Sequence, residues 1–161
     1  MADTGLLDDI DHTTPIGSCL AAWHRLFLGE TDALARVLAD DVVLHSPVLF
    51  APVRGKELVS LYLTGAAMTF VEGAAAGSGG SGPAGDDGWD GRFRYVRMLT
   101  GERDAVLEFE TTMAGKYVNG VDMITCDDDG MIVDFKVMVR PLKAVEAVRE
   151  MMAAALETLQ S

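Results

Sequence analysis

The chain has 161 residues, with 25 acidic and 13 basic side chains, a formal net charge of −12 and no cluster of lysine or arginine. This length fits one domain with a sizeable core. The negative field repels phosphate backbones and anionic lipid, so we expect no binding to nucleic acid or to a membrane. The sequence lacks a signal-like N-terminus and a long apolar run, and Cys19 and Cys126 have neither zinc nor redox spacing. These features predict a soluble cytoplasmic protein.

The first half of the chain is predicted to be mainly helical. Residues 1–12 are expected to form a flexible tail, after which Thr14 and Pro15 begin a helix that Gly29 ends. Thr31 is predicted to cap a short second helix. The run "VVLHSPVLF" at 42–50 indicates a strand interrupted by Pro47, and a third helix follows over 55–71. Its predicted inward stripe consists of Leu58, Leu61, Gly65 and Met68.

A glycine-rich segment, residues 73–91, then interrupts the pattern. Its "GSGGSG", at 77–82, formally satisfies the glycine spacing of a dinucleotide-binding loop. That loop requires a preceding strand and a following helix, whereas here a helix precedes and Pro83 follows. We therefore interpret the segment as a flexible insertion within a single domain that covers residues 13–161.

The second half changes to a period of two. Strands are predicted in "RFRYVRMLT", "AVLEFETTM", "KYVNGVDMITC" and "MIVDFKVMVR", joined by hairpin-type turns. An amphipathic helix over 142–160 closes the chain, with Val145, Val148, Met152 and Leu156 inward. The order of elements predicts an α+β fold: a curved, mostly antiparallel sheet wrapped as a cone around the N-terminal helices, with a C-terminal helix.

One acid stands inside a strand whose apolar residues predict burial. In "NGVDMITC", at 119–126, alternation places Asp122 on the same face as Val118 and Ile124. A buried carboxyl needs a partner, a raised pKa or a chemical role. Two interpretations stay open, an acid that ties the sheet together and an acid/base group in a pocket.

Three stretches carry a resemblance to a known family: "GETDALARVLADDVVLHSPV", "RGKELVSLYL" and "GVDMITCDDDGMIVDFKVMVRP". They resemble the SnoaL-like branch of the nuclear transport factor 2 superfamily, which includes ketosteroid isomerases, polyketide cyclases and limonene epoxide hydrolases. The resemblance implies the cone-shaped fold. It is less specific for activity, because this fold hosts many chemistries and non-catalytic binders.

Functional residues carry over from the family only in part. The proton-abstracting aspartate of ketosteroid isomerase-like proteins corresponds to Ser46, and their helix tyrosine corresponds to about Ala22, beside Trp23. Their oxyanion-hole aspartate corresponds to Asp122. A polyketide cyclase-like site, which depends mainly on one aspartate, is compatible with Asp122. The Asp–Arg–Asp set of limonene epoxide hydrolase-like sites cannot be placed.

The resemblance implies a pocket for a small hydrophobic ligand. Its expected wall residues are Ser46, Trp23, Phe27, Tyr62, Phe135, Val137 and Val139. His45 and His24 are further candidates, although His45 is expected to point away from Ser46. No pair of histidines has the spacing of metal ligands, so we expect neither a metal nor a cofactor.

Two functions remain. One is a cofactor-independent cyclase, isomerase or hydrolase of a small carbonyl or epoxide compound, with Asp122 as acid/base. The alternative is a non-catalytic ligand-binding or dimerisation module with the same cavity. In either case we expect a homodimer formed through the outer sheet face, near Met138.

Overall fold

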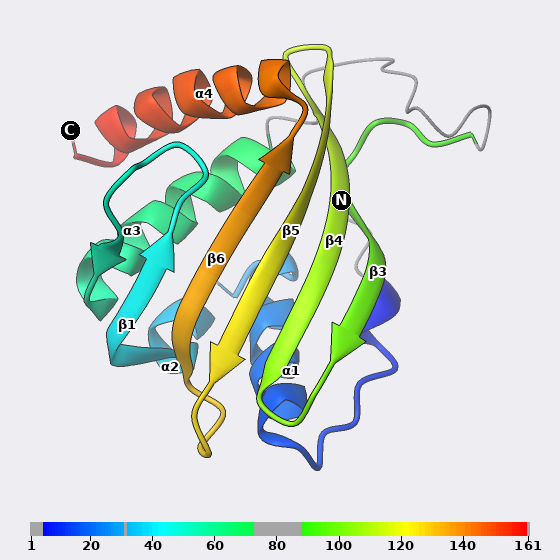
Figure 1. The fold of residues 1–161 in the computed structure, drawn as a ribbon, viewed down its shortest axis with the longest axis vertical. Coiled ribbons are helices and arrows are strands. Elements are labelled where there is room, and N and C mark those ends of the chain that lie inside the picture. The colour runs from blue at the N-terminus through cyan, green and yellow to red at the C-terminus, as the bar shows by residue number, and fades with distance from the viewer. Residues whose placement is uncertain (1–4, 31, 73–87, 161) are drawn as a thin grey trace.

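The computed structural model describes residues 5–30, 32–72 and 88–160 (Figure 1). The helices are α1 (Pro15–Phe27), α2 (Ala33–Val37), α3 (Lys56–Ala67) and α4 (Leu142–Gln160), with a 3-10 turn at Gly5–Leu7 and a π-helical turn at Met68–Glu72. The strands are β1 (Leu38–His45), β2 (Val53–Arg54), β3 (Arg94–Thr100), β4 (Asp104–Met113), β5 (Lys116–Cys126) and β6 (Ile132–Arg140). Among the helices of these residues, none has the length and apolar character needed to cross a bilayer.

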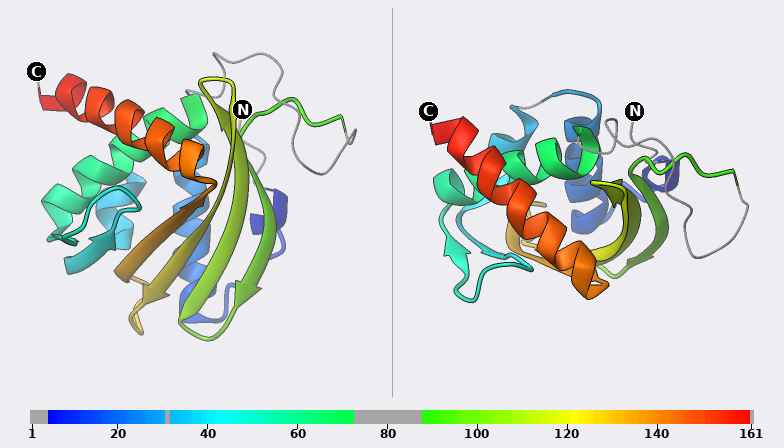
Figure 2. Two further views of the ribbon diagram at one scale, coloured as in Figure 1. Left: turned by 45° about the horizontal axis from the view of Figure 1, so that its top comes forward. Right: turned by 90° about the horizontal axis from the view of Figure 1, so that it is seen from above.

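The strands form one six-stranded sheet in the order β2-β1-β6-β5-β4-β3. Neighbouring strands are antiparallel except β1 and β6, which run parallel. Figure 2 shows the sheet curving around α1, with α3 and α4 across one end. The predicted α+β fold with a curved, mostly antiparallel sheet and a C-terminal helix is therefore confirmed.

The first helix begins as its sequence predicts. The Thr14 hydroxyl accepts a hydrogen bond from the backbone N–H of Gly17 at 3.1 Å, and Pro15 occupies the first turn. This cap satisfies a backbone donor that the helix itself leaves unpaired. Before α2, Asp32 stands at the cap position without a side-chain capping bond, and Thr31 lies outside the described residues.

The tail predicted over residues 1–12 is wrong where the structure describes it. Leu7 is 2% exposed and belongs to the hydrophobic core, and Ile10 packs against that core. The Asp11 carboxylate accepts a hydrogen bond from the backbone N–H of Thr13 at 2.9 Å, just before α1. The burial of Leu7 could not be predicted from the sequence, because its neighbours are acidic and a single buried leucine leaves no periodic pattern.

The stripe predicted for the third helix is shifted. Leu58 is 46% exposed, whereas Val59 and Leu63 are buried. Gly65 is buried as predicted, and a Cβ atom there would lie 3.6 Å from Met152 of α4. In α4, Val148 and Met152 are buried as predicted, together with alanines that let the helix approach its neighbours closely.

The predicted insertion, residues 73–91, lies mostly outside the described residues. Its last residues are described from Gly88 onward. The indole N–H of Trp89 donates to the carbonyl oxygen of Arg92 at 2.9 Å, and the Arg94 guanidinium lies 4.9 Å from the centre of the Trp89 ring. The end of the predicted insertion is therefore attached to the beginning of β3.

Gly120 allows the sheet to pack tightly beside Asp122. A Cβ atom at this position would lie within 2.8 Å of both the Phe109 ring and the carbonyl oxygen of Met138. We expect Gly120→Ala to lower the free energy of unfolding by about 1–3 kcal/mol, because the backbone oxygen cannot move away. Chemical denaturation measures this loss. Gly101→Ala is the control, since its Cβ would meet Asp104 only at 3.7 Å; equal losses in both variants would contradict the packing argument.

Candidate functional site

A cavity of about 300 Å³ lies between the helices and the concave face of the sheet. Its wall is formed mainly by apolar and aromatic side chains, from Trp23, Leu26, Phe27, Gly29, Leu34, Leu63, Thr64, Ala66, Ala67, Met68, Phe70, Phe93, Phe109, Asp122, Phe135 and Val137. This volume is at the lower end for ligand pockets, and apolar walls with few polar groups are typical of such sites.

Aromatic contacts hold one side of the cavity together. Phe93 stacks between Phe27 and Phe109, with ring centres 5.4 and 5.3 Å apart. Trp23 packs on Phe135 at 5.0 Å. Because these rings come from α1, from the residue before β3, and from β4 and β6, their contacts join the helix to the sheet.

Among the residues of this wall that the structure describes, Asp122 is the ionisable one. Asp122 is 7% exposed, and along β5 the buried residues alternate as its sequence predicts. The hydroxyl of Tyr95 donates a hydrogen bond to Asp122 Oδ2 at 3.0 Å. The indole N–H of Trp23 in turn donates to the Tyr95 hydroxyl at 3.1 Å. The three buried side chains thus form a chain of hydrogen bonds that ends on the carboxyl.

Burial raises the pKa of Asp122 to about 7, and the hydrogen bond from Tyr95 offsets part of this rise. Burial, together with the nearby Asp122 carboxyl, also raises the pKa of the Tyr95 phenol well above its ordinary value. A carboxyl with a pKa close to neutrality can both accept and donate a proton near pH 7. The cavity therefore contains a group suited to acid/base chemistry.

The structure brings five of the predicted residues together in the wall: Trp23, Phe27, Asp122, Phe135 and Val137.

The other three expected wall residues lie outside it, which corrects the prediction. Ser46 follows the end of β1, where its hydroxyl accepts a hydrogen bond from the backbone N–H of Val48 at 3.3 Å. Tyr62 is half-buried, and its neighbour Leu63 takes the place in the wall. Val139 pairs with Gly120 further along β6 and packs against the core.

Both candidate histidines also lie outside the wall. His45 Nε2 is 3.1 Å from Asp134 Oδ2 on β6, consistent with a side chain that points away from the cone. His24 Nδ1 is 3.8 Å from an oxygen of Asp8. Within the described part of the chain, no group of three or more histidine, cysteine or acidic side chains is arranged to hold a metal ion.

Tyr95 is the residue that the sequence interpretation missed. Its strand, "RFRYVRMLT", alternates aromatic residues with arginine, so Tyr95 could be placed on either face until the register of β3 was known. The shared face of Phe93 and Tyr95 was the available signal.

Comparison with known proteins shows the family. A steroid delta-isomerase from Pseudomonas aeruginosa is similar over 94% of this chain and 97% of its own, with 31% identity and a TM-score of 0.75. An uncharacterised protein with a cystatin-like fold from Silicibacter pomeroyi is 29% identical over 81% of this chain and 78% of its own, with a TM-score of 0.64. An NTF2-like protein of unknown function from Mesorhizobium loti, 20% identical over 79% of this chain and 92% of its own, shares the fold with a TM-score of 0.58.

The chain belongs to the nuclear transport factor 2-like superfamily. Neither a protein-family model nor a curated protein matches its sequence.

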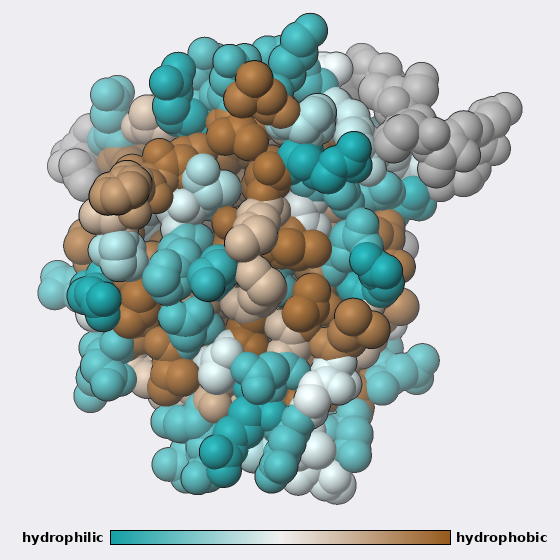
Figure 3. Space-filling model, viewed as in Figure 1, coloured by the Kyte–Doolittle hydropathy of each residue, from teal (hydrophilic) through white to brown (hydrophobic). Residues whose placement is uncertain are grey.

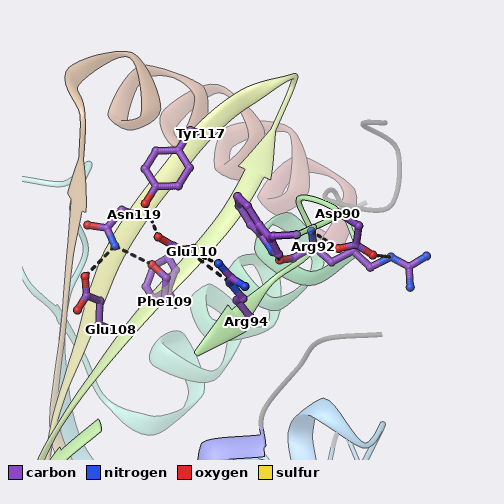
Figure 4. A network of polar contacts seen from close by, with 9 residues as sticks. Asp90, Arg92, Arg94, Glu108, Phe109, Glu110, Tyr117 and Asn119 are labelled. Atoms are coloured by element: carbon purple, nitrogen blue, oxygen red, sulfur yellow. Dashed lines mark hydrogen bonds and ion pairs between the residues drawn. The ribbon is translucent and has the colours of Figure 1, made fainter. Parts of the chain in front are cut away.

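The outer face of this NTF2-like sheet carries a separate set of polar contacts (Figure 4). Arg94 donates to Glu110 Oε2 at 2.9 Å, and the Tyr117 hydroxyl donates to Glu110 Oε1 at 2.6 Å. Asn119 donates to Glu108 at 3.1 Å. Burial, with Glu110 next to it, raises the pKa of Tyr117. These residues face away from the cavity, so their hydrogen bonds do not reach Asp122.

The titration of Asp122 makes a prediction about stability. The raised pKa favours the folded state most below pH 3.8, and this advantage is lost as the pH rises toward about 7. Between pH 5 and pH 8 we expect the wild type to lose about 3 kcal/mol of unfolding free energy relative to Asp122→Asn. Denaturation curves at both pH values measure this difference. Equal slopes for Asp122→Asn and the wild type would contradict the raised pKa.

Proposed function

We propose that this NTF2-like protein is a cofactor-independent enzyme of the SnoaL-like branch that isomerises or cyclises a small hydrophobic carbonyl compound, with Asp122 as general acid and base. The observation that supports this most is a carboxyl with a pKa of about 7 in the wall of an apolar cavity of about 300 Å³. The steroid delta-isomerase at 31% identity supports an isomerase type of chemistry.

The polar groups of the described wall favour a reaction in which a single carboxyl carries out every proton transfer. The indole N–H of Trp23 is used by Tyr95, and the hydroxyl of Thr64 donates to the carbonyl oxygen of Ser60 at 2.8 Å. Among the wall residues that the structure describes, Asp122 is the ionisable one. The carboxylate must therefore both remove a proton and return it.

Isomerisation and aldol-type cyclisation meet this requirement. In the first, Asp122 takes a proton from the carbon beside a carbonyl group and returns it to another carbon of the same conjugated system. In the second, the carbanion left by the same abstraction attacks a second carbonyl group, and Asp122 returns the proton to the new alkoxide. Both steps leave the carboxyl as it began. Epoxide hydrolysis is less favoured, because it needs a water molecule activated while the epoxide oxygen is protonated.

A non-catalytic ligand-binding module is the second candidate. It is favoured by Ser46, which stands where related isomerases have a proton-abstracting aspartate and which lies outside the cavity wall. Such a module would use the protonated Asp122 as a hydrogen-bond donor to a ligand oxygen.

Asp122→Asn separates the two candidates. The amide keeps the size of the side chain and a hydrogen-bond donor but cannot transfer a proton. We expect turnover of a β,γ-unsaturated ketone or a diketone to fall at least about 100-fold, because acid/base catalysis contributes at least this factor. Ligand binding, followed by calorimetry, should change much less.

Asp134→Asn is the matched control, since it makes the same change on the outer sheet face. Wild-type protein that binds ketones but never converts them would favour the binding module. Unchanged turnover in Asp122→Asn would contradict the catalytic role.

We also propose that two copies associate through the outer sheet face. Figure 3 shows hydrophobic residues among hydrophilic ones on this face. Met138 is 54% and Leu99 59% exposed, and Val106, Val121 and Met123 on the strands between them are half-buried. Together these residues form an apolar centre that a second copy would cover, bordered by the ion pairs of Arg94 and Arg97 with β4.

Met138→Glu tests this assembly. If Met138 lies near a two-fold axis, the variant brings two carboxylates together in an apolar interface. We therefore expect the dissociation constant of the dimer to rise at least about tenfold. Sedimentation velocity over a concentration series measures the change. Ala153→Glu adds the same charge on an exposed position of α4 and should leave the dimer intact. A wild-type chain that remains monomeric at high concentration would contradict the proposal.

A further inference from the structure

The hydrogen bonds from Trp23 through Tyr95 to Asp122 have a direction that chemistry determines. An indole nitrogen carries a hydrogen and cannot accept, so the Tyr95 hydroxyl must be the acceptor of the 3.1 Å bond from Trp23. The single hydrogen of that hydroxyl is then available for Asp122 Oδ2, 3.0 Å away. When the Asp122 carboxyl is ionised and can only accept, donor and acceptor types alone fix this direction.

This direction makes the two oxygens of the Asp122 carboxyl unequal. Oδ2 receives the Tyr95 hydrogen. For Oδ1 no hydrogen bond is found to any of the residues described, and Oδ1 is not among the enclosed polar atoms that lack a partner. Because Asp122 is also part of the cavity wall, Oδ1 is the oxygen left open to a ligand.

We infer that Tyr95, oriented by Trp23, is a positioning residue that occupies Asp122 Oδ2 and leaves Oδ1 to carry the exchangeable proton into the cavity. This inference rests on the proposed function for its catalytic meaning. It also has a consequence for ligands. Because the Tyr95 hydroxyl donates its hydrogen to Asp122, it cannot donate to a substrate. Asp122 then offers a ligand a donor when it is protonated and an acceptor when it is ionised, which suits a ligand with a carbonyl group near this point.

Tyr95 is the neighbouring group whose hydrogen bond can change the pKa of Asp122. The residues that line the cavity together with Asp122 include Trp23 from α1, Leu63 from α3, Phe109 from β4 and Phe135 from β6, none of which is ionisable. Apart from burial, the hydrogen bond from Tyr95 is the influence that shifts the pKa of Asp122, and it lowers that pKa. Removing this bond should therefore make the carboxyl a weaker acid.

Nuclear magnetic resonance of the Asp122 side-chain carboxyl carbon tests the inference without requiring any activity. A charge-assisted hydrogen bond of ordinary strength corresponds to a shift of about one to two pH units. In Tyr95→Phe we expect the titration midpoint of Asp122 to move upward by this amount. In Trp23→Phe, where the Tyr95 hydroxyl can still donate, the upward movement should be less than half as large.

The double variant Trp23→Phe/Tyr95→Phe covers the case in which Tyr95→Phe fails to fold because the Trp23 N–H is left without an acceptor. Its titration midpoint should match that expected for Tyr95→Phe alone. An unchanged or lowered midpoint in a folded variant that lacks the Tyr95 hydroxyl would overturn the inference, and so would a shift in Trp23→Phe as large as in the double variant.

Turnover adds a separate readout where the wild type is active. The pH midpoint of kcat in Tyr95→Phe should follow the titration of Asp122, while KM changes less than about threefold. If the wild type has no turnover, the proposed function fails, but the carboxyl titration still decides the role of Tyr95.

Discussion

A hydrogen bond from Tyr95 to the buried carboxyl of Asp122 connects the sheet, the first helix and the cavity. A carboxyl in an apolar cavity is costly to ionise, and one phenolic donor offsets only part of that cost. The bond also joins strands that are not neighbours, because β4 lies between β3 and β5. Through Trp23 the same chain of hydrogen bonds reaches α1, so it connects the helix, the sheet and the acid.

An irregularity in β3 makes this bond possible. From Arg97 to Thr100, each residue of β3 pairs regularly with β4, but the register shifts between Tyr95 and Arg97, so that Tyr95 pairs with Phe109. Without the shift Tyr95 would pair with Glu110 and point toward the outer face, because directly opposed residues share a face. The extra residue, Val96, is 38% exposed and has no partner in the register. A β-bulge that redirects one side chain is a common feature beside functional sites.

Most of the fold could be predicted from the sequence, and the reasons are local. The strands β4 to β6 and the helix α4 were placed to within one residue, since hairpin turns and the change from a helical to a two-residue period mark their ends. The inward orientation of Asp122 followed from alternation in the same way. What failed depends on distant contacts: the burial of Leu7, the face of α3 and the position of Ser46 beyond the end of β1. Tyr95 was missed because alternation places it on the same face as Phe93 without saying which face that is, and the bulge that turns it inward leaves no local mark in "RFRYVRMLT".

The energetics of Asp122 favour a functional over a structural origin for this acid. A carboxylate that ties a sheet together accepts several donors, and its pKa then falls, so that it stabilises the folded state at neutral pH. Among the described residues, Tyr95 is the side chain that donates to Asp122, and the pKa of Asp122 rises instead. At neutral pH the folded chain therefore bears a cost of about 4 kcal/mol relative to an acid with an ordinary pKa. An uncharged residue at this position would avoid that cost, and the cavity around it is apolar enough to accept one. A side chain that weakens the fold at the pH where it is half ionised is better explained by proton transfer or ligand recognition than by packing.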